Sequence, residues 1–423
     1  MVNRQTILEV LLENRQEVMR YEVINRHISL DGFDRRVLVG VRRAGKSYLL
    51  FGHIQNLVRN GVPLEQIVYI NFEDERLANL QLEDLNSILE IQASINNNRP
   101  ILFFDEIQNV DGWEKFARRL ADQKYSVFIT GSNAKMLSQD VASTLGGRFL
   151  TTVVFPFYFE EFLKINGKEI KDPYLLATTG DRARFLQLYE EYFQFGGFPE
   201  CATLPAKRDY LMSLYQKIFL GDIAARNRIE NLFALKTLIR KIAESVNQPI
   251  SFTRATNIVA STGTKIGKNT VINYIEYAKE ACLLFSITNI IDNLTERVSN
   301  PKYYFIDNGI ISLLALDIRT SLLENMIALA LIRKYGSKDA VFYYNNGVEV
   351  DFYIPEAETA IQVSYSIKNS TETFSREVKA LNKISERLVV KRKLIITFDE
   401  EDNAGLNEHG IEIIPAWKFI SNL

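Results

Sequence analysis

One short motif combines residue types that could bind phosphate. An apolar run at residues 37–39 leads into Gly40, four further residues, and then Gly45, Lys46 and Ser47. The glycines let backbone N–H groups close around phosphate oxygens, and the N-terminus of the following helix adds a favourable dipole. Lys46 would reach the β- and γ-phosphates of a nucleotide, and the Ser47 hydroxyl would ligate Mg²⁺. The predicted nucleotide-binding residues are Gly40, Arg43, Ala44, Gly45, Lys46, Ser47 and Tyr48.

A second motif supplies two adjacent carboxylates. The apolar residues 101–104 predict a buried strand, and Asp105 and Glu106 follow it directly. A carboxylate at the tip of such a strand can hold the Mg²⁺ shell, so Asp105 is a predicted metal residue together with Ser47. The neighbouring carboxylate of Glu106 can orient and deprotonate an attacking water molecule. The pair follows the glycine motif by about 60 residues, an order typical of nucleotide-hydrolysing proteins.

Three further residues are candidates for the same chemistry. The segment SVFITGSN predicts a strand that ends in Ser132 and Asn133, either of which could contact the terminal phosphate or position the water. A simple turn at Gly131 is the alternative. Arg148 follows two glycines in the segment LGGR and precedes another predicted strand. It could reach the nucleotide of a neighbouring subunit and stabilise charge in the transition state, or it could be a solvated turn residue.

These residues need a scaffold that brings them to one edge of a sheet. Five apolar segments, RVLVG, IVYINFE, ILFFDE, SVFITG and LTTVVF, alternate with segments of helical periodicity. This alternation predicts an α/β fold with a parallel sheet, whose ligand chemistry lies at the carboxyl ends of the strands. Glu106 beside Asp105 favours a P-loop protein that hydrolyses ATP through a bound water.

Several segments together resemble one prokaryotic family of AAA-type P-loop ATPases. They are, in chain order, GVRRAGKS, INFED, FFDEIQNVDGWE, ITGSNAKML, LGGR, FPFYFEEF and FGGFPE. The family fuses an ATPase domain of the ASCE/AAA type to a C-terminal domain of unknown function with a restriction-endonuclease-like core. The resemblance covers nearly the whole chain. It implies ATP as the nucleotide and Arg148 as a finger in trans, and it leaves the biological role open.

The middle of the chain has helical periodicity. Residues 161–245 predict a helical lid over the nucleotide. Residues 246–300 predict a helix, the turn TGTKIG, a second helix and an apolar strand, which is the plan of a winged helix. A module that only contacts proteins or forms part of the lid is the alternative. The candidate DNA contacts are Arg254, Lys265, Lys268, Asn269 and Asn273, with Tyr274 and Tyr277 among them.

The C-terminal third has the pattern of a metal-dependent nuclease in which two groups are replaced. A predicted helix carries Glu324, and a predicted hairpin carries Glu349 and Asp351. In such nucleases carboxylates bind Mg²⁺, and a Glu-x-Lys pair on the next strand completes the site. Here Gln362 and Ser364 stand at those positions, and neither a neutral amide nor a hydroxyl replaces the missing charges. The sequence predicts a catalytically degenerate nuclease-like domain, with an active nuclease as the alternative.

Composition excludes several classes of protein. The chain of 423 residues has a formal net charge of −2, so any DNA contact must come from local patches. Two cysteines and three scattered histidines argue against a disulfide framework and a His-rich zinc site. The most apolar stretch, ACLLFSITNII, is too short to span a membrane. A cytoplasmic protein without a membrane partner is expected.

The expected organisation has five parts. These are an N-terminal helical segment (1–34), a P-loop ATPase domain (35–160), a helical lid (161–245), a winged-helix region (246–300) and a nuclease-like domain (301–423). The predicted function is Mg²⁺-dependent ATP hydrolysis that drives a DNA-associated motor or remodelling activity in a homo-oligomeric ring. An ATP-controlled switch in signalling or defence is the second hypothesis, and an ATP-regulated nuclease is the third.

Overall fold

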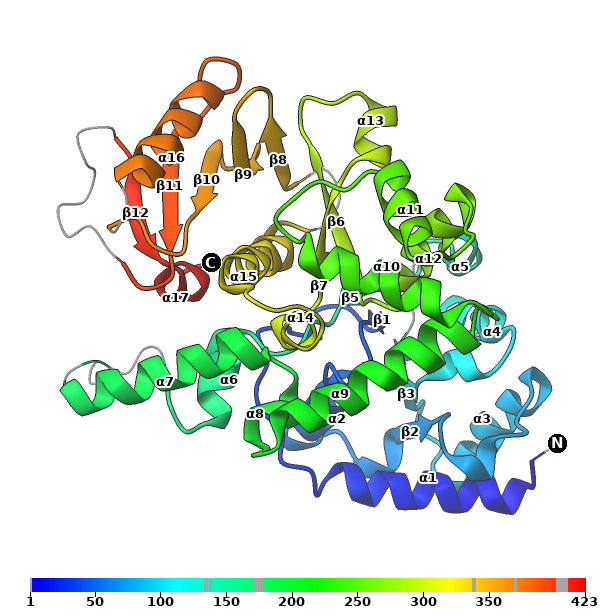
Figure 1. Cartoon of the computed structure of the whole chain (residues 1–423). Helices are drawn as coiled ribbons and strands as arrows, with labels where there is room; N and C mark the ends of the chain where they lie inside the picture. Colours follow the sequence, from blue (N-terminus) through cyan, green and yellow to red (C-terminus); the bar gives the residue numbers. More distant parts are fainter. Residues whose placement is uncertain are drawn as a thin grey trace. The chain divides into compact units, whose positions relative to one another are not determined.

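The computed structural model describes residues 2–132, 136, 139–169, 176, 178–336, 340–368, 371–400 and 410–423. The chain divides into two compact units, Met1–Phe155 and Pro156–Leu423. Each unit has its own sheet, and Figure 1 labels the helices and strands. The finer division into five segments stays a prediction. Within the described ranges, no helix is long and apolar enough to cross a membrane.

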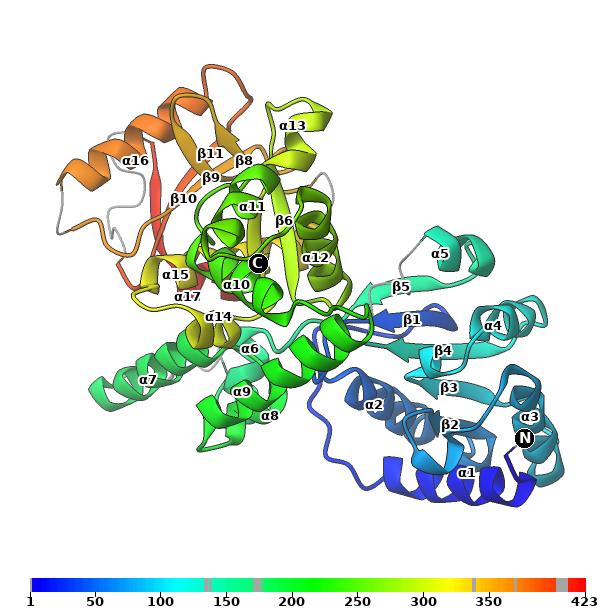
Figure 2. The same cartoon turned by 45° about the vertical axis from the view of Figure 1, so that its right-hand side comes forward.

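The first unit is built on a parallel sheet with the strand order β2-β3-β4-β1-β5. Figure 2 shows the five strands in this order. Most residues of β1 to β4 are buried, as expected for a parallel sheet that is covered on both faces. The predicted α/β parallel sheet is therefore confirmed. The strands are β1 (Arg35–Val39), β2 (Ile67–Asn71), β3 (Ile101–Asp105), β4 (Ser126–Gly131) and β5 (Leu150–Val153).

The N-terminal helix α1 is part of this first unit. It buries one apolar face at helical spacing. Its Arg15 is buried too, and the guanidinium donates to the carbonyl oxygens of Glu65 and Ile67, at 3.2 and 3.0 Å, where β2 begins. The helices of the unit are α1 (Arg4–Val18), α2 (Lys46–Arg59), α3 (Leu85–Ile95), α4 (Trp113–Asp122) and α5 (Gln139–Leu145), with 3₁₀ turns at Leu64–Gln66, Glu75–Leu77, Leu82–Asp84 and Ile107–Asn109.

The second unit is built on a mixed sheet with the order β12-β11-β10-β9-β8-β6-β7. Strand β6 pairs antiparallel with β7 and parallel with β8, so the segments on either side of residue 300 share one sheet. Strand β9 has antiparallel neighbours, whereas β10, β11 and β12 run parallel. The strands are β6 (Leu284–Asn289), β7 (Lys302–Phe305), β8 (Phe342–Asn345), β9 (Glu349–Ile354), β10 (Thr359–Val363), β11 (Arg392–Thr397) and β12 (Glu412–Pro415).

Two long helices, α15 (Arg319–Tyr335) and α16 (Thr371–Ile384), pack on opposite faces of this second sheet (Figure 1). Successive residues of β10 point toward α16 and α15 in turn, because side chains of a strand alternate between the faces of a sheet. Ala360 lies in the core under α16, whereas Ile361 faces the side of α15. Every residue of α15 from Ser321 to Ile332 is buried, which accounts for the apolar residues on all its sides.

The other helices of the second unit mostly precede its sheet in the chain. Helices α10, α11 and α12 lead directly into β6, which matches the predicted order of helix, turn, helix and strand. The Ser251 hydroxyl caps α11, and a β-bridge joins Pro249 to Lys302 of β7. These helices are α6 (Phe159–Ile165), α7 (Thr179–Phe195), α8 (Pro199–Thr203), α9 (Lys207–Lys217), the π-helix Ile218–Ala225, α10 (Leu232–Glu244), α11 (Phe252–Ser261), α12 (Lys268–Glu280), α13 (Leu294–Ser299), α14 (Asn308–Leu314) and α17 (Ala416–Ser421).

Candidate active site

The glycine motif forms the connection from β1 to α2 and depends on both of its glycines. A side chain at Gly40 would place its Cβ 2.0 Å from the carbonyl oxygen of Val154, which follows β5. Gly45 caps the N-terminus of α2 with a φ of +90°, in the left-handed region that favours glycine. The neighbouring strand and the helix start therefore fix the loop as a backbone cradle. Such a cradle directs N–H groups toward an anion.

Lys46 is the first residue of α2 and is buried. Its Nζ donates to the carbonyl oxygens of Gly40 and Val41 at 3.1 and 3.2 Å. The same nitrogen lies 3.5 Å from Oε1 of Glu106. The ammonium group therefore connects the glycine loop to the carboxylate that follows β3.

Asp105 lies at the carboxyl end of β3 and is fully buried. Its carboxylate accepts hydrogen bonds from the Tyr69 hydroxyl at 2.7 Å, from the Thr130 hydroxyl and from the Ser47 hydroxyl. These donors come from β2, β4 and α2. Burial raises the pKa of Asp105, and the negative charge of Glu106 adds to the shift, while the hydroxyl donors oppose it.

Glu106 is held in an unusual backbone conformation, with a φ of +55°. Its N–H donates to the Thr130 hydroxyl at 2.9 Å. Its Oε2 accepts from Gln108 Nε2 at 2.5 Å and from the Ser132 N–H at 3.1 Å. Burial favours the neutral acid, but the charge of Lys46 and these hydrogen bonds lower the pKa of Glu106 overall. Glu106 is therefore an oriented anion near neutral pH.

The donor set at the carboxyl end of β3 fits Mg²⁺. Ser47 and Asp105 offer hard oxygen atoms, and their side chains are already in contact. A magnesium ion here would therefore take its remaining ligands from water and phosphate, as is usual for this ion.

Three aromatic rings lie beside the glycine motif and were not predicted as a group. Tyr48 is exposed, and its ring centroid lies 5.5 Å from that of Tyr21 and 5.4 Å from that of Phe51. Tyr21 and Phe51 stack at 4.8 Å. The sequence indicated Tyr48 only by its position after Ser47. Tyr69, Thr130 and Gln108 were missed because they come from other segments and meet Asp105 and Glu106 only through the folded sheet.

Arg148 lies at the opposite end of the sheet from the glycine loop. It precedes β5, and the parallel register pairs Arg36 near the start of β1 with Leu150. The loop follows the other end of β1, which is roughly 16 Å away at the usual rise of a strand. The Arg148 Nε donates to Asp122 Oδ1 at 2.5 Å. Asn133, the other predicted catalytic residue, lies outside the described residues.

The candidate DNA contacts lie on α11, on α12 and in the turn between them. Arg254, Lys265, Lys268, Asn269 and Asn273 are all exposed.

The prediction that Tyr274 is exposed among these residues is wrong. Its side chain is only 7% exposed, because it lies on the buried stripe of α12 with Val271, Ile275 and Ala278. Tyr277 is half-buried.

The structure brings together the carboxylates of the nuclease-like pattern. Glu324, Glu349 and Asp351 all contact the ammonium group of Lys302.

Gln362 serves as a hydrogen-bonding bridge near these carboxylates. Its Oε1 accepts from the Asp351 N–H at 2.8 Å, and its Nε2 donates to the Glu349 carbonyl oxygen at 3.0 Å and to Glu377 Oε2 at 2.6 Å. The Ser364 hydroxyl donates to the carbonyl oxygen of Ser366 at 3.2 Å.

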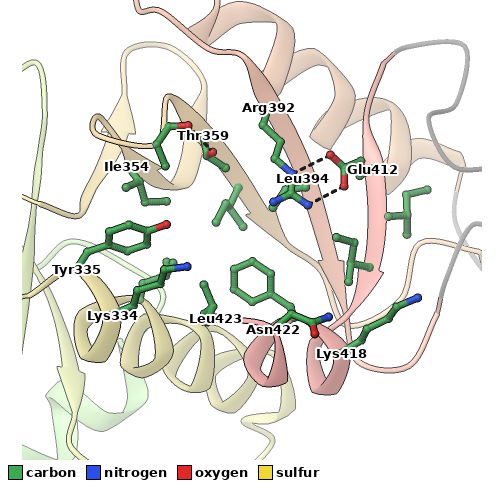
Figure 3. Close-up of a pocket in the computed structure, with 16 residues that line it drawn as sticks. Lys334, Tyr335, Ile354, Thr359, Arg392, Leu394, Glu412, Lys418, Asn422 and Leu423 are labelled. Atoms are coloured by element: carbon green, nitrogen blue, oxygen red, sulfur yellow. Dashed lines mark hydrogen bonds and ion pairs between the residues drawn. The ribbon is translucent and has the colours of Figure 1, made fainter. Parts of the chain in front are cut away.

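The second unit also contains a pocket of about 760 Å³ (Figure 3). It is lined by α15, α17 and one face of the sheet, with apolar residues such as Ile361 and Leu394. Arg392 and Glu412 form an ion pair at its wall at 2.8 Å. None of the predicted site residues lines this pocket.

Comparison with known proteins gives matches to both parts of the chain. A family model described as an AAA domain matches residues 35–163, and one described as a domain of unknown function (DUF8612) matches residues 186–321. The uncharacterized protein MJ1544 of Methanocaldococcus jannaschii is 36% identical over 99% of this chain and 96% of that protein. An uncharacterized protein of Haemophilus influenzae is 28% identical over 90% of this chain and 92% of that protein.

Among solved structures, the Walker-type ATPase PABY2304 of Pyrococcus abyssi is similar over 75% of this chain and 96% of that chain. The TM-score is 0.44 and the identity is 14%. The AAA-domain match includes the glycine motif, Asp105 and Glu106, whereas the nuclease-like assignment of the C-terminal part stays a prediction. The full-length similarity to MJ1544 is sufficient to show common membership. The chain therefore belongs to the same family as the Methanocaldococcus jannaschii protein MJ1544, with an AAA domain at residues 35–163.

Proposed function

We propose that this protein is a cytoplasmic, Mg²⁺-dependent ATPase. The observation that carries the proposal is the convergence of Lys46, Asp105 and Glu106 at the carboxyl end of the parallel sheet. Lys46 Nζ lies 3.5 Å from Glu106, and the Ser47 hydroxyl bonds Asp105. This combination supplies phosphate binding, metal binding and water activation within one small site.

Each side chain has a separate task in the proposed hydrolysis. The glycine loop and Lys46 bind the β- and γ-phosphates, and the ammonium offsets charge that develops on the transferred group. Ser47 and Asp105 would hold Mg²⁺, which would neutralise phosphate charge. Glu106 orients the attacking water and accepts its proton. Gln108 and the Ser132 N–H fix the direction of the Glu106 carboxylate.

A binding and turnover assay tests the proposal. We expect ATP hydrolysis that needs Mg²⁺ and stops in EDTA. Lys46→Ala should weaken ATP binding and abolish turnover, because the phosphates lose their main cation. Lys115→Ala is the matched control, since Lys115 is exposed on α4. Turnover that survives EDTA or Lys46→Ala would refute the proposed site.

The position of Arg148 favours an assembly of several chains. An arginine at the amino end of the sheet lies too far from the glycine loop to serve the same nucleotide. It could reach the nucleotide of an adjacent copy if the ATPase domains form a ring. The proposed role is a finger in trans that stabilises transition-state charge.

DNA is the proposed partner of the second unit. The order α10, α11, α12, β6 and β7, with the bridge from Pro249 to Lys302, supports a winged-helix region. Its exposed lysines can contact phosphates.

The proposed DNA contact is tested by measuring DNA affinity and DNA-stimulated ATPase for Lys265→Glu. Lys236→Glu, on an exposed position of α10, is the control. Equal loss in both variants, or no DNA binding by the wild type, would contradict the proposal.

A second candidate function is an ATP-controlled switch. The near-neutral net charge and the structural bonds of Gln362 favour a unit that binds a partner rather than cleaving DNA. A switch requires that ATP and ADP stabilise different conformations. Scattering profiles recorded with ADP and with a non-hydrolysable ATP analogue should then differ, and coinciding profiles would rule the switch out.

A further inference from the structure

A fully buried ammonium group lies among the carboxylates of the second unit. Lys302 Nζ is 2.7 Å from Glu349 Oε1, 3.1 Å from Glu324 Oε1 and 3.5 Å from Asp351 Oδ1. The lysine is on β7, whereas its partners are on α15 and β9. The three carboxylates therefore converge on one positive charge.

These contacts account for all the hydrogen-bonding capacity of the lysine. An ammonium group has three N–H donors, and three carboxylates surround this one. The Lys302 side chain is 0% exposed, and the Tyr343 ring lies beside the ammonium with its centroid 5.5 Å away. No donor remains to meet a phosphate or a water molecule. Lys302 therefore has the contacts of a structural counter-ion and lacks those of a nuclease lysine.

The carboxylates are also held by groups other than Lys302. The Tyr304 hydroxyl donates to Glu324 Oε1 at 2.8 Å, and the Val363 N–H donates to Asp351 Oδ2 at 2.8 Å. The second bond lies where the regular pairing of β9 with β10 ends, and Gln362 bonds the Asp351 N–H at the same place. The positions of the Glu324 and Asp351 carboxylates therefore depend on these two donors as well as on Lys302. Both donors would remain if the ammonium were removed.

The cluster contains more negative groups than positive ones. Glu349 is the most accessible member, with 38% of its side chain exposed. A small cation entering from solvent would therefore find hard oxygen ligands on this side. Lys302 now occupies the space between those oxygens.

We infer that the Lys302 ammonium takes the place of a divalent cation, so that the nuclease-like core of the second unit is assembled without metal. The site lies in the second unit and does not depend on the proposed ATPase activity of the first. Gln362, which stands where the nuclease-like pattern predicts a carboxylate, bridges β9 and β10 instead. The oxygens of Glu324, Glu349 and Asp351 are accessible to a metal only after Lys302 is removed.

Metal binding by lysine variants tests this inference. Mn²⁺ binding is measured by calorimetry and by electron paramagnetic resonance on the full chain without nucleotide, with Asp105→Asn present throughout to remove the proposed metal site of the first unit. Lys302→Ala should bind Mn²⁺ about tenfold or more tightly than the parent, because the variant lacks the charge that repels the ion and leaves the carboxylate oxygens free to bind it. Adding Asp351→Asn should remove the gain. Lys279→Ala, a surface change on α12, should gain nothing.

Thermal unfolding provides a second readout in the same protein. The parent should unfold at the same temperature in EDTA and in Mn²⁺. Lys302→Ala should unfold at a lower temperature in EDTA and regain part of the loss in Mn²⁺, because the ion restores the missing positive charge. Lys302→Met keeps the volume of the side-chain stem and replaces the alanine variant if that variant does not fold.

Three results would overturn the inference. One is Mn²⁺ binding by the parent that Asp351→Asn abolishes. Another is metal-dependent cleavage of DNA by the wild type that Lys302→Met abolishes, which would make Lys302 a nuclease lysine. The third is a folded Lys302 variant that gains no Mn²⁺ binding and no thermal response to Mn²⁺.

Discussion

Glu106 depends on β4 for its backbone and on Ser132, the residue after β4, for its side chain. A non-glycine residue in the left-handed region costs on the order of 1 kcal/mol or more, so the surrounding structure must hold it there. The Thr130 hydroxyl accepts its N–H, and the Ser132 N–H donates to its carboxylate. The strand between β1 and β3 therefore sets the direction in which Glu106 can act on a water molecule.

The sequence identified Lys46, Ser47, Asp105 and Glu106 because they lie in two linear motifs with known chemistry. It could not identify Tyr69 and Thr130 as their partners. These residues come from neighbouring strands, and only the register of the sheet brings their hydroxyl groups to Asp105. Chemistry that is local in sequence was predictable, whereas contacts made across the sheet were not.

Removal of the Tyr69 hydroxyl should weaken the metal site. In Tyr69→Phe, Asp105 loses the 2.7 Å hydrogen bond that orients its carboxylate. Changes to such supporting groups usually cost about tenfold in metal affinity. The Mg²⁺ concentration for half-maximal ATPase activity should rise accordingly, while nucleotide binding without metal stays unchanged. Tyr125→Phe is the control, and an equal Mg²⁺ requirement in both variants would contradict the role of Tyr69.

A buried aspartate should make the second unit sensitive to pH. Burial raises the pKa of Asp307 from 3.8 to about 7, although the Gly197 and Gly309 N–H groups and Arg333 oppose the shift. The folded state therefore holds a proton that the unfolded state releases above about pH 4. Asp307 contributes its full stabilisation of the folded state below about pH 4, and this stabilisation is lost as pH rises through about 7.

Urea unfolding of the wild type and Asp307→Asn from pH 4 to pH 8 measures this contribution. The free energy of unfolding of the wild type should fall relative to the variant as pH rises, by about 1.4 kcal/mol per unit of pKa difference at most. Asp209→Asn, at an exposed position, is the control. A difference between wild type and Asp307→Asn that is the same at every pH would exclude this effect.

At the scale of elements, periodicity predicted the strands of the first sheet and the helix and hairpin that carry Glu324 and Asp351. The predicted exposure of Tyr274 was wrong. The residues around Tyr274 suggested a polar surface, but its spacing from Val271 places it on the buried stripe of α12. The sequence also gave no reason to select Lys302. Its partners are distant in the chain, and β7 is a strand of four residues.

The junction of β9 and β10 should be sensitive to the charge of Gln362. The Gln362 amide nitrogen now donates to Glu377 Oε2 at 2.6 Å and to the Glu349 carbonyl oxygen. Gln362→Glu would replace this nitrogen with a carboxylate oxygen, which cannot donate. Two lost donors and a like-charge contact should reduce the free energy of unfolding by roughly 1–3 kcal/mol. Gln187→Glu, at an exposed position of α7, is the control for urea unfolding. Equal stability of the two variants would show that the bridge is unimportant.

In the whole molecule, ATP turnover should need more than one chain. The sequence suggests Arg148 as a finger by its place before a predicted strand and by family resemblance, and within a single chain it lies at the end of the sheet opposite the glycine loop. A neighbouring copy would supply the arginine that each nucleotide site lacks. The assembly itself depends on surfaces between chains, which neither periodicity nor linear motifs specify.

Mixing two inactive variants tests this shared site. Arg148→Ala and Glu106→Gln should each reduce ATPase activity by about two orders of magnitude or more. When they are mixed, some interfaces combine an intact Glu106 with an intact Arg148 from the adjacent chain, so part of the activity should return. Arg118→Ala, at an exposed position of α4, should remain active alone. A mixture no more active than its components would place Arg148 outside the active site.

The most direct measurement is the rate of phosphate release from bound ATP in wild type and Glu106→Gln, with ATP affinity measured on the same samples. Glu106 is proposed to act on water and not to hold the nucleotide. Glu106→Gln should therefore bind Mg²⁺–ATP with affinity close to that of the wild type and release phosphate about 10²–10⁴-fold more slowly. Glu83→Gln, on an exposed turn, should match the wild type in both. Unchanged phosphate release in Glu106→Gln would contradict the proposed mechanism.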